Sequence, residues 1–321
     1  MKSVTVFAPA TVANVACGFD IFGFAVHEPG DVAKVIRREK PGVEIVKITG
    51  DDGKLPKSAE KNTAGFAAIR YLETIGSRQG IAIELQKKMP LSSGLGSSAA
   101  SAVAVLWAIN TLFANRLTKA ELLYIALQSE KLACGAAHAD NVAPALFGGF
   151  VLIRPSGSSR ISGEDEPPDI VELPVPENLY CSIIHPEVEV RTAAARNILS
   201  PTVPLNDAVR QWANTAGLVA GLYRKDFALI GRALNDNIIE PQRARLIPHF
   251  YEVKQAAIEN GALGCSISGS GPSVFALSQS QTEAHKICNA FQAVMNSHKI
   301  DNQVYMSAIN TAGPITVAQE G

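Results

Sequence analysis

The sequence predicts a mixed α/β fold, with strands and helices alternating through both halves of the chain. Apolar residues at positions 81, 83 and 85 alternate with less apolar ones, which predicts a half-buried strand. Residues 99–114 are apolar and rich in good helix formers, which predicts a buried helix. Residues 155–169 are rich in Ser, Gly, Pro and acidic side chains. This change in composition predicts two domains, 1–155 and 170–321.

The amino-acid composition argues against several classes of protein. A chain of 321 residues, 47% hydrophobic and 18% charged, is ordinary for a soluble globular protein with ample core. The net charge of −1 offers no overall field to recruit nucleic acid or an anionic membrane. Five widely spaced cysteines without a CxxC pair argue against a disulfide framework or a cysteine-based zinc site. The apolar runs at 4–8 and 99–114 are too short for a signal peptide or a membrane span, so we expect a cytoplasmic protein.

A loop rich in glycine and serine joins the strand at 81–86 to the helix at 99–114. Gly94 and Gly96 have no Cβ, so consecutive N–H groups can point at one ligand. The N-terminus of the helix adds unpaired N–H groups and the positive end of its dipole. The sequence therefore predicts an anion site here, most simply for phosphate.

Two other phosphate loops were considered for this stretch. The P-loop is excluded because no lysine lies between Met89 and Lys119. The pattern Gly94-x-Gly96-x-x-Ala99 matches the dinucleotide fingerprint, but the chain continues into another helix near residue 118 instead of a second strand. A small-residue turn that lets a helix pack closely on a sheet is the alternative without function.

The first half contains further candidate polar residues. A strand is predicted at 4–8, followed by a segment of small residues that holds Asn14 and Asp20, either of which could serve a turn. Strands at 32–37 and 43–48 precede a helix that Asn62 would cap and that ends near residue 75. A capping box at 118–121 begins a helix that carries Glu130.

Beyond that helix, His138, Asp140 and Asn141 are grouped among alanines, which indicates close approach to a polar ligand. A strand at 150–153 follows. The second half predicts strands at 180–184, 274–277 and 303–308, and helical segments from 191, at 205–223, 226–235, 238–243 and 281–298. A second loop of glycines and serines spans 265–274.

These strings resemble one superfamily. Residues 90–98 resemble Pro-x-x-x-Gly-Leu-Gly-Ser-Ser, the ATP loop of the galactokinase, homoserine kinase, mevalonate kinase and phosphomevalonate kinase (GHMP) superfamily. Residues 9–20 resemble the first motif of homoserine kinases, Pro-x-Thr/Ser-x-Ala-Asn-x-x-x-Gly-Phe-Asp, and residues 265–274 resemble the third superfamily motif. Val-Arg-Thr at 190–192 and Glu-Pro-x-Arg at 240–243 resemble substrate-binding segments of homoserine kinases.

The resemblance implies the GHMP kinase fold. Its N-terminal α/β domain is similar to domain 2 of ribosomal protein S5, its smaller C-terminal domain is ferredoxin-like, and the active site lies in the cleft. It also implies the reaction of ATP with L-homoserine to give O-phospho-L-homoserine and ADP, a step towards threonine. The partners implied are these two substrates, with neither nucleic acid nor membrane, and a homodimer is one assembly open to the chain.

Roles for individual residues follow from the same resemblance. Asn62 would contact adenine, and Ser98 and Glu130 would bind Mg²⁺ and count, with Asn141, as catalytic residues. The remaining nucleotide-binding positions would be the loop and the start of its helix: Pro90, Leu91, Ser92, Ser93, Gly94, Leu95, Gly96, Ser97, Ala99 and Ala100. The amino-acid substrate would be held by Asn14, Asp20, His138, Asn141, Arg191, Arg243 and Gly269.

Asn141 sets the expected chemistry. Several superfamily members carry an aspartate base at this position, whereas an amide cannot accept the proton of a hydroxyl group as a base. We therefore expect no protein base, with the proton passing to the γ-phosphate or to water, and Asp140 is the competing candidate. Two other functions remain open: a mevalonate-type kinase, disfavoured by Asn141 and the arginines, and a non-catalytic nucleotide sensor, disfavoured by Ser98 and Glu130.

Overall fold

A computed structural model describes residues 1–135, 137–155 and 167–321, with the backbone alone at 132–134. The first of its two sheets has the order β11-β1-β2-β4-β3, with β5 paired to β2 and β6 to β5. Its strands are β1 (Ser3–Ala13), β2 (Phe22–Arg38), β3 (Val43–Thr49), β4 (Gly80–Gln86), β5 (Phe150–Arg154), β6 (Asp169–Leu173) and β11 (Ile315–Glu320). Only β3 and β4 are described as a parallel pair, and a helix connects them, as a parallel connection requires.

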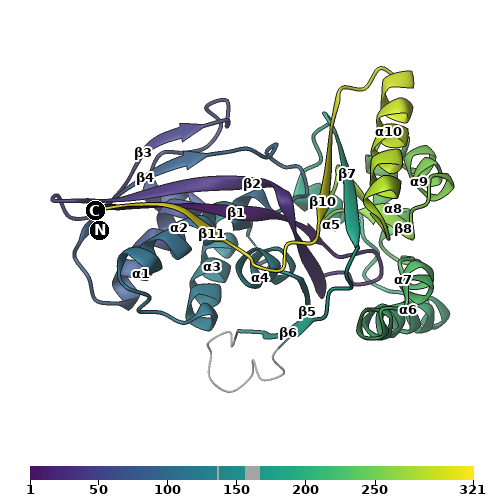
Figure 1. The fold of residues 1–321 in the computed structure, drawn as a ribbon, viewed down its shortest axis with the longest axis horizontal. Helices are drawn as coiled ribbons and strands as arrows, with labels where there is room; N and C mark the ends of the chain where they lie inside the picture. The colour runs from purple at the N-terminus through teal and green to yellow at the C-terminus, as the bar shows by residue number, and fades with distance from the viewer. Residues whose placement is uncertain (136, 156–166) are drawn as a thin grey trace.

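Four helices cover one face of this sheet: α1 (Thr63–Thr74), α2 (Ser97–Leu112), α3 (Lys119–Cys134) and α4 (Ala139–Phe147) (Figure 1). The alternating residues of β1 and β4 point into this layer, where Val4, Val6, Ile81 and Ile83 are fully buried. Helix α2 is buried along most of its length, as its apolar composition predicts. The Gly/Ser loop therefore ends at a helix that the core holds firmly.

The second sheet is antiparallel, in the order β10-β7-β9-β8. Its strands are β7 (Tyr180–Pro186), β8 (Gly264–Ile267), β9 (Val274–Ser278) and β10 (Asn302–Ala308). Helices α9 (Phe250–Glu259) and α10 (Gln281–Ser297) pack against it, and Phe250, Ile287 and Phe291 bury themselves in this smaller core. The other helical segments of this half are α5 (Thr192–Asn197), α6 (Leu205–Arg224), α7 (Phe227–Ala233) and α8 (Glu240–Arg243), with 3-10 turns at Ala59–Lys61 and Ala244–Leu246.

Several elements differ from the sequence expectation. Strand β1 continues to Ala13 instead of stopping near residue 8, and β2 begins at Phe22, ten residues before the predicted strand. The second part of β1 is buried on both faces, so it shows none of the alternation that marks a half-exposed strand. Helices α4 and α9 and strands β6, β8 and β11 were not predicted, and β8 includes the first three residues of the loop expected at 265–274.

Sheet membership crosses the predicted domain boundary. Strands β5 and β6 pair with each other on either side of it, and β11 from the C-terminus pairs with β1. The two chain ends lie side by side, with the Lys2 N–H donating to the Glu320 carbonyl at 2.8 Å (Figure 1). Residues 156–166 of the predicted linker lie outside the described residues, and the limits 1–155 and 170–321 remain a prediction.

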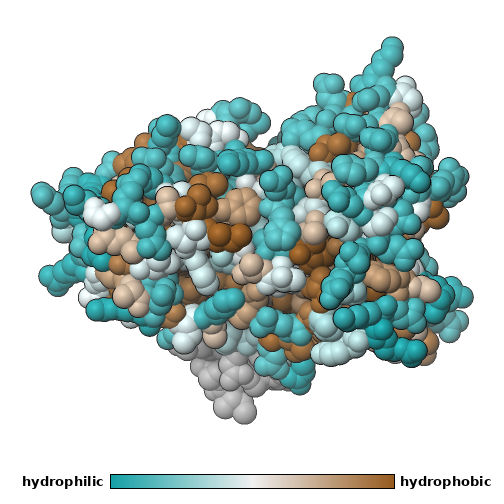
Figure 2. Space-filling model, viewed as in Figure 1, coloured by the Kyte–Doolittle hydropathy of each residue, from teal (hydrophilic) through white to brown (hydrophobic). Residues whose placement is uncertain are grey.

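The surface on the viewed side is mostly hydrophilic, with hydrophobic side chains in separate patches (Figure 2). Among helices of the described residues, none combines the length and the apolarity needed to cross a bilayer.

Candidate active site

The Gly/Ser loop is in close contact with two other segments of the chain, the second part of β1 and the loop after β8. Gly94 and Gly96 both have left-handed φ angles, 77° and 67°. A Cβ on Gly94 would lie 2.4 Å from the carbonyl oxygen of Ser268, and one on Gly96 would lie 2.1 Å from Thr11 Oγ1. Glycine is required at both positions by conformation and by space. Helix α2 begins directly after Gly96, so its first N–H groups have no partner within the helix and are suited to a phosphate.

The three motifs that are distant in sequence meet here through hydrogen bonds. Ser268 Oγ, from the loop after β8, donates to the Gly94 carbonyl at 2.8 Å. The next residue, Gly269, donates its N–H to the Ala13 carbonyl at 3.1 Å. Its own carbonyl accepts from Asn14 Nδ2 at 2.7 Å. The first and third motifs thus form one wall around the second.

A cavity of about 990 Å³ opens over this junction. Its volume lies at the upper end of the range for ligand pockets, which suits two substrates side by side. The predicted site residues that line it are Asn14, Asp20, Asn62, Pro90, Leu91, Ser92, Ser93, Gly94, Gly96, Ser97, Ser98, Ala99, Glu130, His138, Asn141, Arg243 and Gly269. Three predicted residues do not line it: Leu95 and Ala100 are buried in the core, and Arg191 is placed elsewhere.

A group of charged side chains lines part of this cavity. Asp20, whose φ is 62°, accepts two hydrogen bonds from Arg196 of α5, at 2.8 and 2.9 Å. Arg243 of α8 is 3% exposed and donates to the Gly269 carbonyl at 2.9 Å. The two guanidinium carbons lie 5.2 and 5.0 Å from the centre of the Phe19 ring. The structure thus fixes two cations beside one carboxylate.

Arg196 lines the cavity, and the predicted Arg191 does not. The Arg191 side chain is 80% exposed and pairs with Glu189 at 3.0 Å, at the N-cap of α5. Arg191 precedes α5 and has extended backbone, whereas Arg196 lies within the helix, so the two side chains project in different directions. Which of the two faces inward depends on how α5 packs, and the pattern Val-Arg-Thr does not contain that information.

Helix α4 presents the polar cluster predicted at 138–141. Asp140 is 4% exposed; burial, and then the negative charge of Asp20, raise its pKa to about 7. Burial, and then the positive charge of Arg196, lower the pKa of His138. Asn141 Oδ1 accepts a hydrogen bond from Thr11 Oγ1 at 2.9 Å, so its amide N–H groups are the atoms left to act on a ligand.

Two side chains with hard oxygen atoms, Ser98 of α2 and Glu130 of α3, line the cavity. Ser98 Oγ lies 2.9 Å from Thr63 Oγ1, and Glu130 is 3% exposed. A hydroxyl and a carboxylate beside a phosphate site are the donor types that Mg²⁺ prefers, so these residues fit the expected ion.

Asn62 performs the capping role that its position predicts. Its Oδ1 accepts from the Ala64 N–H at 3.0 Å and its Nδ2 donates to the Pro56 carbonyl at 2.9 Å. Both ends of the amide are therefore used within the fold, although Asn62 lines the cavity. Its contact with adenine remains a prediction.

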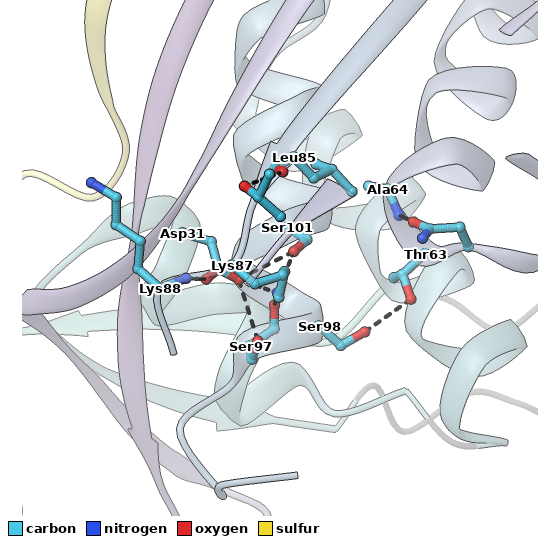
Figure 3. A network of polar contacts seen from close by, with 11 residues as sticks. Asp31, Thr63, Ala64, Leu85, Lys87, Lys88, Ser97, Ser98 and Ser101 are labelled. Carbon is cyan, nitrogen blue, oxygen red and sulfur yellow. Dashed lines mark hydrogen bonds and ion pairs between the residues drawn. The ribbon is translucent and has the colours of Figure 1, made fainter. Parts of the chain in front are cut away.

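A buried ion pair behind the loop was not predicted. Lys87 and Asp31 form a salt bridge with both side chains 2% exposed. Lys87 Nζ also donates to the Ser97 carbonyl at 2.8 Å and to Ser101 Oγ at 2.6 Å, and Asp31 accepts from the Lys88 N–H at 2.9 Å (Figure 3). Asp31 lies within β2 and Lys87 directly follows β4, and the local sequence around neither residue predicts the pair. Only the pairing of β2 with β4 brings the two side chains together.

Comparisons with known proteins agree with this geometry. Residues 62–149 match the family model "GHMP kinases N terminal domain", and residues 218–297 match "GHMP kinases C terminal". A homoserine kinase from Chlorobium phaeobacteroides (strain BS1) is 48% identical, over 98% of this chain and 99% of its own length.

Solved structures extend the comparison to the fold. A homoserine kinase from Cytophaga hutchinsonii superposes with a TM-score of 0.93 at 56% identity, covering 99% of this chain and 98% of the other. A mevalonate kinase from L. major, solved with R-mevalonate, shares the fold with a TM-score of 0.73 at 16% identity, covering 95% and 96% of the two chains. With three converging motifs, both GHMP domains and near-complete alignment to its relatives, the chain belongs to the GHMP kinase superfamily and, within it, to the homoserine kinases.

Proposed function

We propose that this protein transfers the γ-phosphoryl group of ATP to the hydroxyl of L-homoserine, giving O-phospho-L-homoserine and ADP. The observation that carries the proposal is the group of Asp20, Asp140, Arg196 and Arg243, which lines the same cavity as the Gly/Ser loop. An amino acid has a carboxylate and an ammonium group close together. Guanidinium groups suit the carboxylate, and a carboxylate from the protein suits the ammonium.

The same charges argue against a mevalonate-type substrate. Mevalonate carries a carboxylate but no ammonium, so it would compete with Asp20 for Arg196 and bring no cation to replace that arginine at Asp20. An unpaired charge in a desolvated site is costly, and this cost would select for a zwitterion. Arg196 and Arg243 both lie over the Phe19 ring. Together they keep the site positively charged enough to bind the substrate carboxylate while Arg196 remains paired with Asp20.

The chemistry we propose relies on positioning. The homoserine oxygen attacks the γ-phosphorus, the bond from this phosphorus to the β,γ-bridging oxygen breaks, and the hydroxyl proton passes to the γ-phosphate or to water. Loop N–H groups between Ser92 and Ser98 hold the phosphates, and the Asn141 amide donates to an oxygen of the reacting groups. No side chain accepts the proton in this scheme.

We further propose that Ser98 and Glu130 hold Mg²⁺, directly or through water. When bound there, the ion would offset phosphate charge that the backbone N–H groups alone would leave uncompensated. Support comes from the buried position of Glu130 and from the two oxygen groups lining one cavity with the loop. A homodimer and a cytoplasmic location are the remaining proposals drawn from the sequence.

A coupled assay of ADP release tests the function. With Mg²⁺ and ATP present, we expect turnover with L-homoserine and only background release with mevalonate, galactose or buffer. Turnover with mevalonate and none with homoserine would establish the mevalonate-type alternative. ATP binding without turnover on any of these substrates would favour the non-catalytic sensor. Glu130→Gln should lower turnover at least tenfold, as expected for loss of a metal ligand.

A further inference from the structure

Three potential metal ligands meet outside the active site, where helices α9 and α10 pack together. His249 is the N-cap of α9, Glu252 lies in the first turn of the same helix, and His298 is the C-cap of α10. One ligand atom from each lies within 4.8 Å of the others. None of the three lines the active-site cavity as the described residues define it.

The arrangement is already close to that of a binding site. Glu252 Oε1 lies 2.8 Å from His249 Nδ1, and Glu252 Oε2 lies 2.7 Å from His298 Nε2. The two imidazole rings stack with centroids 3.4 Å apart and planes at 11°. One carboxylate therefore aligns two imidazole nitrogens from different helices, and the helix ends hold the two rings at a short separation.

A metal ion can take the place of the N–H protons that lie between the two histidine rings and the Glu252 carboxylate. A carboxylate only accepts, so each histidine must turn an N–H towards it. Both histidine side chains are 32% exposed, and solvent can hydrogen-bond to the opposite ring nitrogens. A tautomer change therefore frees both inward lone pairs, and a bound ion would replace the two hydrogen bonds to Glu252 that this change breaks.

We propose that His249, Glu252 and His298 form a binding site for one borderline divalent transition-metal ion, such as Zn²⁺. Two imidazole nitrogens and one carboxylate oxygen favour such an ion over Mg²⁺ or Ca²⁺, which prefer oxygen ligands alone. The remaining coordination positions face solvent and would hold water. The bound ion ties the start of α9 to the end of α10 and is independent of the phosphoryl-transfer reaction.

The His249 side chain makes no capping hydrogen bond to the helix that follows it. Its ring is instead directed to Glu252 and His298, so it is held against the two other members of the cluster.

Zinc titration of the metal-free full-length protein tests the proposal. Calorimetry without nucleotide or Mg²⁺ should show one Zn²⁺ per chain, and bound Cu²⁺ should show nitrogen ligation by electron paramagnetic resonance. His249→Ala and His298→Ala should each weaken zinc binding at least tenfold, and Glu252→Gln should weaken it by a similar order. His285→Ala, an exposed histidine elsewhere on α10, is the matched control and should bind as the unaltered protein does.

Stability and activity give two further readouts. Saturating Zn²⁺ should raise the thermal midpoint of the unaltered protein and of His285→Ala by several degrees and leave that of His298→Ala unchanged. The Mg²⁺-supported ADP release of metal-free His298→Ala should equal that of the unaltered protein. Zinc binding weaker than about 100 µM would overturn the proposal, since built protein sites bind more tightly. Zinc affinity equal to that of the unaltered protein in the histidine variants would also overturn the proposal, because the ion would then lie elsewhere. If an alanine variant does not fold, the zinc affinity of Glu252→Gln and the Cu²⁺ spectrum test the site instead.

Discussion

At the scale of single residues, the pairing of Asp20 with Arg196 brings into the cavity an arginine to which the sequence analysis assigned no role. Arg196 contacts Asp20 through both terminal nitrogens, while Arg191 is largely in solvent. An exposed pair such as Arg191 with Glu189 contributes little to stability or binding. The structure therefore moves the expected role in substrate binding from Arg191 to Arg196 and keeps Arg243.

We expect Arg196→Ala and Arg243→Ala to raise the KM for homoserine roughly ten- to hundredfold, the cost of losing a charged hydrogen bond in a desolvated site. The KM for ATP should change much less. Arg191→Ala is the matched control and should behave almost as the unaltered enzyme does. Steady-state kinetics with each substrate varied in turn makes the measurement. An equal rise in the KM for ATP would place these arginines at the phosphates instead.

Asp140 links the site to pH. Its pKa of about 7, against 3.8 for an unperturbed aspartate, means that the folded protein holds the proton more tightly than the unfolded chain. Its contribution to stability is therefore fully present below about pH 4 and decreases as the pH rises to about 7. The difference corresponds to about 4 kcal/mol of unfolding free energy.

We expect Asp140→Asn to remove this dependence, so that denaturant titrations between pH 5 and 8 give a flatter stability profile. Asp301→Asn, an exposed aspartate, is the control and should keep the slope of the unaltered protein. At pH 8 the kcat of Asp140→Asn should fall by less than tenfold, because a general base would account for roughly 10²–10⁴. A hundredfold loss of kcat in a folded variant that still binds ATP would identify Asp140 as the base.

At the scale of elements, the start of α2 depends on groups from two strands. Asp31 of β2 and Lys87 after β4 hold the Ser97 carbonyl and Ser101, both in the first turns of the helix (Figure 3). This network sets where the helix begins and therefore where its first N–H groups point. The buried pair costs desolvation energy, and its benefit is the position of the loop.

We expect Asp31→Asn to lower the unfolding free energy by about 3–5 kcal/mol, because it leaves the buried ammonium of Lys87 without its carboxylate. The double variant Asp31→Asn/Lys87→Met removes both charges and should regain much of that loss. It should nevertheless show a raised KM for ATP, since the Ser97 carbonyl loses its partner. Denaturant titration and ATP kinetics of the two variants make the comparison. A double variant with unchanged ATP kinetics would show that the network serves stability alone.

The elements differ in how far local sequence determines them. Helix α3 begins at Thr118 with both hydrogen bonds of the predicted capping box, and β4 follows its apolar alternation. Strands β6 and β11 have mostly exposed residues and no strong alternation, and they exist because β5 and β1 offer them edges to pair with. Their assignment required the partner strand, which lies far away in sequence for β11.

At the scale of the whole molecule, the first and last strands of the chain pair with each other. Strand β11 returns from the second sheet to pair with β1, and Glu320 binds both Lys34 and Ser3. The first sheet therefore includes strands from beyond the predicted boundary at 155 and 170, while the second sheet belongs entirely to the later residues. The C-terminal end of the chain therefore forms one edge of the first sheet.

We expect fragment 1–155 not to unfold cooperatively alone, because it lacks β6 and β11 and leaves β1 with an unpaired edge. Expressed together, fragments 1–155 and 170–321 should associate and recover homoserine-dependent ADP release. Thermal unfolding followed by circular dichroism measures this, with full-length protein as the reference. A sharp transition in fragment 1–155 would show that β11 adds nothing essential to the first sheet.

The sequence by itself determined the chemistry of the loops and placed most of its predicted site residues correctly around the cavity. Gly94 and Gly96 need left-handed backbone, the helix after them supplies N–H groups, and Ser98, Glu130 and Asn141 have fixed donor and acceptor atoms. These properties belong to residue types and short spacings, and they hold wherever the segment lies.

Only the tertiary structure decided which side chains meet. It chose Arg196 over Arg191 through the packing of α5, joined Asp31 to Lys87 across β2 and β4, and brought Ser268 against Gly94. It also raised the pKa of Asp140 to about 7 by burying it near Asp20. The physical reason is that burial, ion pairing and close contact depend on distances between residues far apart in the chain, and local patterns of sequence do not contain those distances.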